Sequence, residues 1–213
     1  AFPLNGNGDV RQLLDGVAIV GSNTHSVFQA KDRLEIEWDE GQASKDSWTQ
    51  MVKRANELKG NQGSETIIDK GDVEQEFSNT ENRVLESFYE YPFVAHFCME
   101  PMNCTADYRK GSSGEKDSLE LWLPHQMATR AVPTLEEMFG LNTDRITINP
   151  VRLGGSFGRR IYTEYACEAV AISKEIGKPV KLTWTREDDV RHDFYRVGGF
   201  QSVKGAVDKN GKL

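Results

Sequence analysis

The sequence predicts an α+β fold built in two parts. Residues 1–63 show a strand–helix–strand unit followed by a helical pattern, whereas apolar and polar residues alternate as in strands from residue 84 onward. Between the two patterns, residues 59–82 are rich in Gly, Asn, Gln, Ser, Asp and Glu, which is typical of a linker. We therefore expect a first unit at 1–63, a linker at 64–82 and a mixed sheet with packed helices over 83–213.

The overall composition excludes several classes of protein. The chain has 213 residues, enough to bury a core without disulfides, and its formal net charge of -7 gives it no general attraction to nucleic acid. No stretch approaches the ~18 consecutive apolar residues that a membrane-spanning helix needs, so we expect no membrane span. Any export signal would precede Ala1, so the sequence does not distinguish a cytoplasmic from a periplasmic location.

The first unit begins with a short strand. Glycines bound the apolar residues 16–21, which predicts a buried strand, and Thr24 is a candidate N-cap for the helix that follows. Alternating apolar and polar residues at 34–38 predict a second, half-exposed strand. A polar loop at 39–46 precedes a second helix, whose apolar face carries Trp48, Met51, Val52, Ala55 and Leu58.

The second unit is predicted to be rich in strands, because apolar side chains recur there with the two-residue period of a half-buried sheet. The expected strands are 84–91, 93–99, 119–123, 146–148 and 180–184.

Two helices are predicted between these strands. Residues 134–139 follow Pro133, which suits a first helical turn, and precede Gly140, which suits the position after a helix. A longer helix is predicted at 161–176, because its apolar residues are spaced three and four apart and Gly177 ends the pattern.

The C-terminal residues resemble half of a hairpin. Residues 203–207 predict a strand and 208–211 a tight turn, which leaves only Lys212 and Leu213 for the returning strand. An incomplete hairpin would leave an unpaired edge. We therefore expect this chain to be a piece of a longer polypeptide.

The strongest local signal is the glycine-rich segment 153–160, between a predicted strand and a predicted helix. Glycines there allow backbone N–H groups to approach a ligand, and Arg159 and Arg160 add positive charge for a phosphate or carboxylate. The spacing matches neither G-x-x-x-x-G-K-[ST] nor G-x-G-x-x-G. A tight strand-to-helix turn without a ligand explains the composition equally well.

Gln126 and His125, at the end of a predicted strand, form a second candidate site. The amide of Gln126 can both donate and accept hydrogen bonds at a place where ligands often bind. His125 is a candidate base or metal ligand, but no partner for it is visible nearby in the sequence. Taken alone, each residue is better explained as part of a loop without a chemical role.

Other polar clusters are weaker. The carboxylates and His192 in 186–193 suggest a metal site, but a helix start with acidic residues explains them better, because the neighbouring arginines would repel a cation. Glu100 with His96 suggests acid–base chemistry, and a structural turn is equally compatible. The cysteines lack zinc or iron–sulfur spacing and are interpreted as buried apolar side chains: Cys98, Cys104 and Cys167.

Four motifs, in this order, give the chain a family resemblance. They are HFCMEPMNCTA at 96–106, ELWLPHQ at 120–126, GGSFGRR at 154–160 and GKPVKLTWTREDD at 177–189. Together they resemble the large, molybdopterin-binding subunit of the xanthine oxidase family of molybdenum hydroxylases, and most closely its isoquinoline 1-oxidoreductase and aldehyde dehydrogenase beta-subunit type. Residues 17–39 are similar to the second half of the small α/β hammerhead domain of that family.

The resemblance implies a fold and a cofactor site. It assigns 1–63 to the C-terminal part of a hammerhead-like domain and 83–213 to the N-terminal part of a molybdopterin-binding domain. The family's G-G-x-F-G loop approaches molybdenum and its pterin, which implies cofactor contacts by Gly154, Gly155, Phe157 and Gly158. The family's glutamine that hydrogen-bonds an oxo ligand corresponds to Gln126. No protein side chain is implied as a metal ligand.

The reaction that the resemblance implies is oxidation of an aldehyde or N-heterocycle, with water as the oxygen source. The implied partners are the remainder of the same subunit, a small [2Fe–2S] iron–sulfur subunit and the small-molecule substrate. The implied cofactor of the full-length enzyme is molybdenum–molybdopterin in its cytosine dinucleotide form. Ile161 stands where the purine-specific branch has a glutamate, which argues against purine specificity.

The family's catalytic base, a glutamate, lies far downstream of the position where this chain ends, and so do many pterin contacts. We therefore expect the isolated fragment to be inactive and to carry no cofactor. Two other hypotheses remain open. One is a stand-alone α/β module that binds an anionic small molecule at the Gly154–Gly158 loop, and the other is a structural interaction domain.

Overall fold

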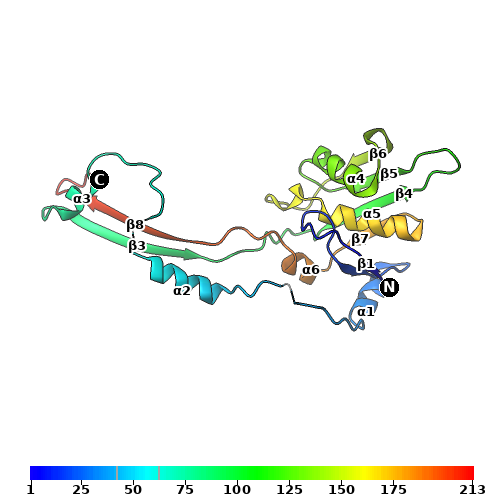
Figure 1. Cartoon of the computed structure of the whole chain (residues 1–213), viewed down its shortest axis with the longest axis horizontal. Coiled ribbons are helices and arrows are strands. Elements are labelled where there is room, and N and C mark those ends of the chain that lie inside the picture. Colours follow the sequence, from blue (N-terminus) through cyan, green and yellow to red (C-terminus); the bar gives the residue numbers. More distant parts are fainter. Residues whose placement is uncertain (42, 62) are drawn as a thin grey trace. The chain divides into compact units, whose positions relative to one another are not determined.

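A computed structural model of the chain describes residues 1–41, 43–61 and 63–213, and it divides into two compact units (Figure 1). Unit 1 comprises Ala1–Glu37 and Ala95–Tyr195, and unit 2 comprises Trp38–Val94 and Arg196–Leu213. The linker predicted at 64–82 lies within unit 2. Gln42 in the predicted loop and Gln62 in the polar stretch lie outside the described residues. The assignment of residues to two named domains stays a prediction.

Unit 1 is built on a four-stranded mixed sheet of order β6–β5–β4–β7, which confirms the predicted α+β class. Its strands are β4 (Asn103–Arg109), β5 (Ser118–Leu123), β6 (Ile146–Pro150) and β7 (Val180–Thr183). β4 pairs antiparallel with β5 and β7, and β5 pairs in parallel with β6. A parallel pair needs a crossover between its strands, and α4 (Ala131–Phe139) lies in the connection from β5 to β6.

The core of unit 1 follows from the alternation in β5. Leu119, Leu121 and Leu123 are buried, whereas Trp122 between them is exposed. The neighbouring strand β4 adds Cys104 and Ala106 to the core, and both side chains are fully buried. α5 (Glu164–Ile176) contributes the other half of the core, because eight of its residues are buried. Replacing one such leucine by alanine costs about 2–5 kcal/mol of stability.

Glycines end both helices where the sequence predicts. Gly140 follows α4 with φ +66° and Gly177 follows α5 with φ +63°, the left-handed conformation that glycine adopts without a Cβ penalty. The predicted start of α5 at Ile161 is wrong. Arg159–Ile161 form a 3₁₀ turn, η3, and the extended Tyr162 separates it from α5. Two further 3₁₀ turns, η1 (Ala128–Arg130) and η2 (Thr143–Arg145), flank α4.

The N-terminal part of unit 1 contains one small sheet and one helix. β1 (Phe2–Leu4) pairs antiparallel with β2 (Gly16–Ala18), so the predicted strand at 16–21 is present but shorter. α1 (Thr24–Lys31) begins at Thr24, but its N-cap is Asn23, whose side chain accepts the N–H of Ser26.

Two predicted strands are wrong. Residues 34–38 form neither helix nor strand, because the described residues place no partner strand beside them. Residues 93–99 contribute a single bridge, from Val94 to Arg196. Phe97 has φ +50°, which is incompatible with an extended strand at that point.

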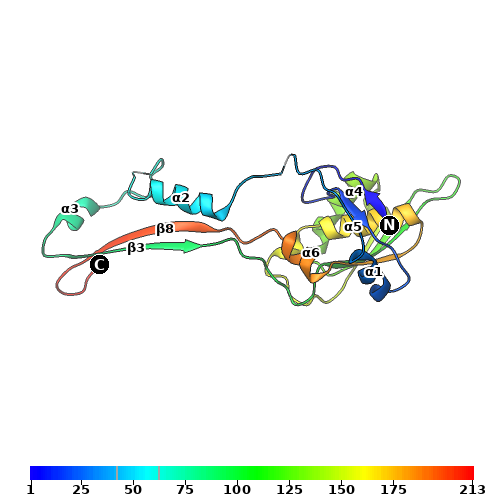
Figure 2. The same ribbon diagram turned by 90° about the horizontal axis from the view of Figure 1, so that it is seen from below.

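Unit 2 is a long two-stranded ribbon with helices beside it (Figure 2). β3 (Arg83–Tyr91) pairs antiparallel with β8 (Gly199–Val207) over all nine residues of each strand. α2 (Trp48–Leu58) and α3 (Val73–Ser78) precede it, and α2 matches its predicted bounds. Trp48 holds α2 to the ribbon: its ring stacks on Phe200 at 5.0 Å and meets Phe93 edge-on at 5.9 Å.

The ribbon corrects the predicted C-terminal hairpin. The turn at Asp208–Gly211 is present, with Gly211 N–H donating to the Asp208 carbonyl. The strand 203–207, however, takes β3 as its partner and not Lys212 and Leu213. The strand β8 thus has nine paired residues with a segment distant in sequence, a pairing that the local turn pattern did not predict. No helix in the described part of the chain is long and apolar enough to cross a membrane.

Candidate functional site

The glycine-rich loop 154–158 connects the end of β6 to η3 in unit 1. Gly155, Phe157 and Gly158 have φ of +100°, +54° and +103°, so three of five residues adopt the left-handed region. Such strain persists only where surrounding contacts enforce it, and it gathers at functional sites.

Both ends of this loop are tied down by side chains from other segments. Gly154 donates its N–H to Glu100 Oε2 at 2.8 Å, and Glu100 returns its own N–H to the Gly154 carbonyl at 3.2 Å. At the other end, Gly158 donates its N–H to Gln126 Oε1 at 3.0 Å. A Cβ on Gly154 would lie 2.6 Å from the Cβ of Glu100, so only glycine fits there.

In the middle of the loop, the backbone N–H groups have no hydrogen-bond acceptor among the described residues. Within the described part of the chain, no acceptor is found for the N–H groups of Gly155, Ser156 and Phe157. Three successive N–H groups in a turn of mixed handedness form a concavity that binds anions. This observation fits the expected cofactor, because an anionic group would satisfy donors that the chain itself leaves unpaired.

Arg160 determines the path of the loop. Its guanidinium is fully buried and donates to the carbonyls of Gly155, Pro124, Glu100 and Pro101, and it also pairs with the Glu100 carboxylate at 3.0 Å. Lysine has a single donor atom and cannot form hydrogen bonds to all of these acceptors. A single side chain thus joins the three segments that surround the loop.

Arg159 is also buried, and its guanidinium forms ion pairs within the protein. Its guanidinium pairs with Glu164 and, through Nε, with Asp193 Oδ1 at 2.9 Å. The rings of Trp184 and Phe194 lie 5.6 and 5.1 Å from its central carbon. Burial raises the pKa of the Glu164 carboxyl, and Arg159 opposes that shift.

These contacts overturn one expectation. The sequence interpretation placed Arg159 and Arg160 as charge for an incoming phosphate or carboxylate, but the two side chains are 1% and 0% exposed and paired within the protein. They build the loop and do not present charge to a ligand. Glu100, considered for acid–base chemistry, binds Gly154 and Arg160 instead.

Gln126 is placed as a donor. Because its Oε1 accepts from Gly158, the free end of its amide is the nitrogen, which carries two N–H groups. Gln126 also donates its backbone N–H to the Arg160 carbonyl at 2.9 Å. Its neighbour His125 is buried, accepts the N–H of Met127 at Nδ1, and has a pKa lowered by burial. We therefore assign His125 to the scaffold.

The acidic segment 186–193 shows no arrangement for metal binding. Thr185 and Asp188 form a capping box at the start of α6 (Arg186–Arg191), and Asp188 also pairs with Lys31. Asp189 pairs with Arg186 at 2.6 Å. No group of three or more His, Cys, Asp or Glu side chains suited to a metal ion occurs among the described residues. Burial raises the pKa of each cysteine thiol, so none favours the thiolate form: Cys98, Cys104 and Cys167.

The segment before Glu100 contributes a pair that the sequence did not predict. His96 Nδ1 lies 3.0 Å from Asp193 Oδ1, and the backbone N–H of His96 also donates to Asp193. The partners are 97 residues apart, so no local spacing signals the pair. Next to it, Phe97 and Phe157 are the two non-glycine residues with positive φ in the described part of the chain, and both are largely exposed.

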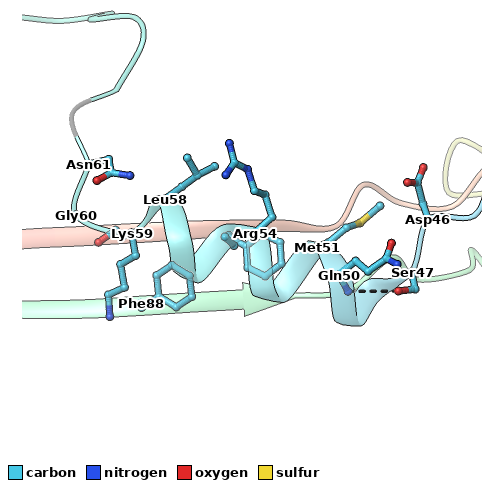
Figure 3. Close-up of a pocket in the computed structure, with 13 residues that line it drawn as sticks. Asp46, Ser47, Gln50, Met51, Arg54, Leu58, Lys59, Gly60, Asn61 and Phe88 are labelled. Carbon is cyan, nitrogen blue, oxygen red and sulfur yellow. Dashed lines mark hydrogen bonds between the residues drawn. The ribbon is translucent and has the colours of Figure 1, made fainter.

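A groove lies in unit 2, and none of the residues that line it belongs to the glycine loop. It encloses about 660 Å³ beside α2, with Met51, Arg54 and Leu58 on the helix side and Phe88 on the ribbon (Figure 3). The residues that surround it show no convergent catalytic group, since its carboxylate, Asp46, lies at the rim beside the cap residue Ser47. The loop site is therefore the stronger candidate.

Comparison with known proteins identifies the family of this chain. A family model described as the molybdopterin cofactor-binding domain matches residues 56–213. The chain is 31% identical over 209 residues to a membrane-bound aldehyde dehydrogenase of Gluconacetobacter polyoxogenes, named for pyrroloquinoline-quinone. That match covers 96% of this chain and 26% of the relative. It is 28% identical over 216 residues to isoquinoline 1-oxidoreductase subunit beta of Brevundimonas diminuta, covering 93% of this chain and 26% of the relative.

Among solved structures, CO dehydrogenase from Oligotropha carboxidovorans shares 25% identity with a TM-score of 0.47, over 67% of this chain and 17% of that one. The chain spans about a quarter of the length of these two curated relatives. The family model covers most of the chain, including the whole loop and the segments that hold it. The chain belongs to the molybdopterin cofactor-binding domain family, as the resemblance predicted from its four motifs.

Proposed function

We propose that this chain forms part of the catalytic subunit of a molybdenum hydroxylase that oxidises an aldehyde or an N-heterocycle. The family match supports a cofactor-binding role. The names of two relatives, an aldehyde dehydrogenase and an isoquinoline oxidoreductase, support the substrate classes. Water supplies the oxygen, and electrons pass to a small iron–sulfur subunit.

One observation carries the proposal: the open N–H groups of residues 155–157 lie between two ends that other side chains hold. Gly154 and Gly158 donate their N–H groups to Glu100 and Gln126, and these two hydrogen bonds fix both ends of the loop. The N–H groups between them are therefore held in place without internal acceptors. Donors that are held in place before a ligand arrives stabilise negative charge with little reorganisation. An anionic cofactor is the ligand that best fits this arrangement.

Each residue of the site has a defined task in this proposal. Gly155 and its two successors donate backbone N–H groups, and Gln126 donates through its amide nitrogen. Gly154 and Gly158 keep the loop close to the neighbouring segments, and the largely exposed Phe157 would contact the bound group. The molybdopterin group, in its cytosine dinucleotide form, supplies the two-electron oxidation chemistry when bound.

The direct test uses the parent polypeptide that contains this chain, produced together with its iron–sulfur partner. We expect near-stoichiometric molybdenum, a pterin released on oxidation, and cytidine monophosphate released on acid hydrolysis. Turnover of aldehydes and N-heterocycles in ¹⁸O-labelled water should place the label in the product. A parent protein without pterin, or label arriving only from O₂, would refute the proposal.

The loop geometry also supports the alternative, a stand-alone module for an anionic small molecule. In that case the isolated chain should bind phosphate, molybdate or a small carboxylate in calorimetry. We expect no binding, and no molybdenum after purification, because this chain covers only 26% of each of the two relatives and the resemblance implies that many pterin contacts lie downstream of Leu213. Micromolar binding of a small anion by the chain alone would favour the module.

A further inference from the structure

His96 and Asp193 form a buried pair that has no assigned role in the cofactor site described above. The side chain of His96 is 11% exposed and that of Asp193 is 2% exposed. Nδ1 of His96 lies 3.0 and 3.1 Å from the two carboxylate oxygens of Asp193. A carboxylate can only accept, so Nδ1 carries the proton and Nε2 is the other, unprotonated nitrogen of the neutral ring.

The free nitrogen points at the glycine loop. A Cβ built on Gly158 would lie 3.9 Å from His96 Nε2, and no atom outside Gly158 and its two chain neighbours is closer to that position. None of the hydrogen bonds formed by the described residues uses Nε2. The pair therefore offers a polar atom, in a nearly buried side chain, directly beside the last residue of the proposed cofactor loop.

Asp193 is itself held in place, which makes the ring orientation rigid. It accepts the backbone N–H of His96 and lies 2.9 Å from Arg159 Nε. Arg159 in turn pairs with Glu164 at the start of α5. A histidine oriented by a carboxylate through Nδ1 is the arrangement that proteins use when Nε2 must meet a ligand in one fixed direction.

We propose that His96, oriented by Asp193, contributes Nε2 as a side-chain hydrogen-bonding group to the anionic ligand of the 154–158 loop. This inference rests on the proposed function and adds a residue to its site. The imidazole supplies what the loop lacks, a side-chain ring nitrogen held in one fixed direction, which forms a hydrogen bond with an oxygen or sulfur atom of the cofactor.

Two substitutions at one position separate this role from simple scaffolding. In His96→Asn the amide nitrogen replaces Nδ1 and keeps the contact to Asp193, but no atom remains at Nε2. In His96→Gln the amide reaches the Nε2 position and the contact to Asp193 is lost. The isolated 213-residue chain reports folding through its melting temperature, and the parent protein reports the ligand through molybdenum and pterin content.

We expect His96→Asn to melt within a few degrees of wild type and to retain about one tenth of the wild-type cofactor content, the effect of one lost hydrogen bond. His96→Gln should melt lower and retain more cofactor per folded molecule. Full cofactor content in His96→Asn would overturn the inference and leave the proposed function intact. A wild-type parent without pterin would overturn the proposed function and this inference with it.

A second measurement holds even if the variants fold poorly. The chain has 4 histidines, so long-range ¹H–¹⁵N spectra of the wild-type chain at alkaline pH can assign each neutral ring. We expect His96 in the form with the proton on Nδ1. A proton on Nε2 alone would show that Nδ1 does not donate to Asp193, and would overturn the orientation on which the inference rests.

Discussion

Gly158 donates its backbone N–H to Gln126 Oε1 across 3.0 Å, although the two residues are 32 positions apart. This hydrogen bond does two things at once. It holds the end of the glycine loop against the segment that follows β5, and it leaves the amide nitrogen of Gln126 as the free end of that side chain. A residue that resembled a lone polar side chain in the sequence thereby becomes an oriented donor.

Replacing Gln126 by alanine should lower turnover of the parent enzyme roughly tenfold to hundredfold, below the ~10²–10³ found where a full charge develops. The loss is smaller because the open N–H groups of the loop share the task. The isolated chain should melt only a few degrees lower, since one exposed hydrogen bond is lost. Unchanged turnover with normal molybdenum content would exclude a role for this amide.

Gly155→Ala should destabilise the isolated chain by about 1–3 kcal/mol, because φ of +100° is strained for any residue with a Cβ. Space is not the cause, since the nearest atom to the added Cβ lies at an ordinary 3.5 Å. Gly16→Ala is the matched control: it lacks positive φ and has open surroundings. Urea unfolding of both variants checks this, and equal stability would show that the loop tolerates side chains.

Arg160→Lys should destabilise unit 1 by about 3–5 kcal/mol, because one ammonium cannot serve the carbonyls and carboxylate that the buried guanidinium serves. The control is Arg109→Lys on β4, whose side chain is 65% exposed and should change stability by less than about 0.5 kcal/mol. Thermal melts followed by circular dichroism measure both. If the two variants melt alike, Arg160 does not organise the loop.

The raised pKa of Glu168 leads us to expect that the stability of the chain changes with pH. Burial raises the pKa of its carboxyl to about 8, although Trp184 Nε1 donates to it at 2.6 Å and opposes the rise. The folded chain then holds a proton that the unfolded chain, with a pKa of 4.5, releases. This contribution to stability is complete below the unfolded pKa and is lost as pH rises from there through about 8.

The melting temperature of the wild-type chain should therefore fall by several degrees between about pH 5 and pH 8.5. Glu168→Gln keeps an acceptor for Trp184 and cannot ionise, so its melting temperature should depend less on pH over that range. Parallel slopes for wild type and Glu168→Gln would assign the pH dependence to other groups.

Local pattern by itself determined much of the fold. The alternation at 119–123 predicted β5, the glycines at 140 and 177 predicted the ends of α4 and α5, and the apolar face from Trp48 to Leu58 predicted α2. These elements are set by interactions between residues close in sequence: side-chain period, helix caps and left-handed glycines. The four motifs likewise identified the family, since they are read directly from the chain.

Only the tertiary structure decided what the pattern left open. The predicted strand at 34–38 failed because a strand needs a partner, and the strand at 203–207 took β3 and not its own neighbours. Arg160 looked like a ligand-binding group until its buried contacts to four carbonyls were visible. His96 meets Asp193 from 97 residues away. Such pairings depend on which distant segments fold together, and residue spacing along one chain does not encode that directly.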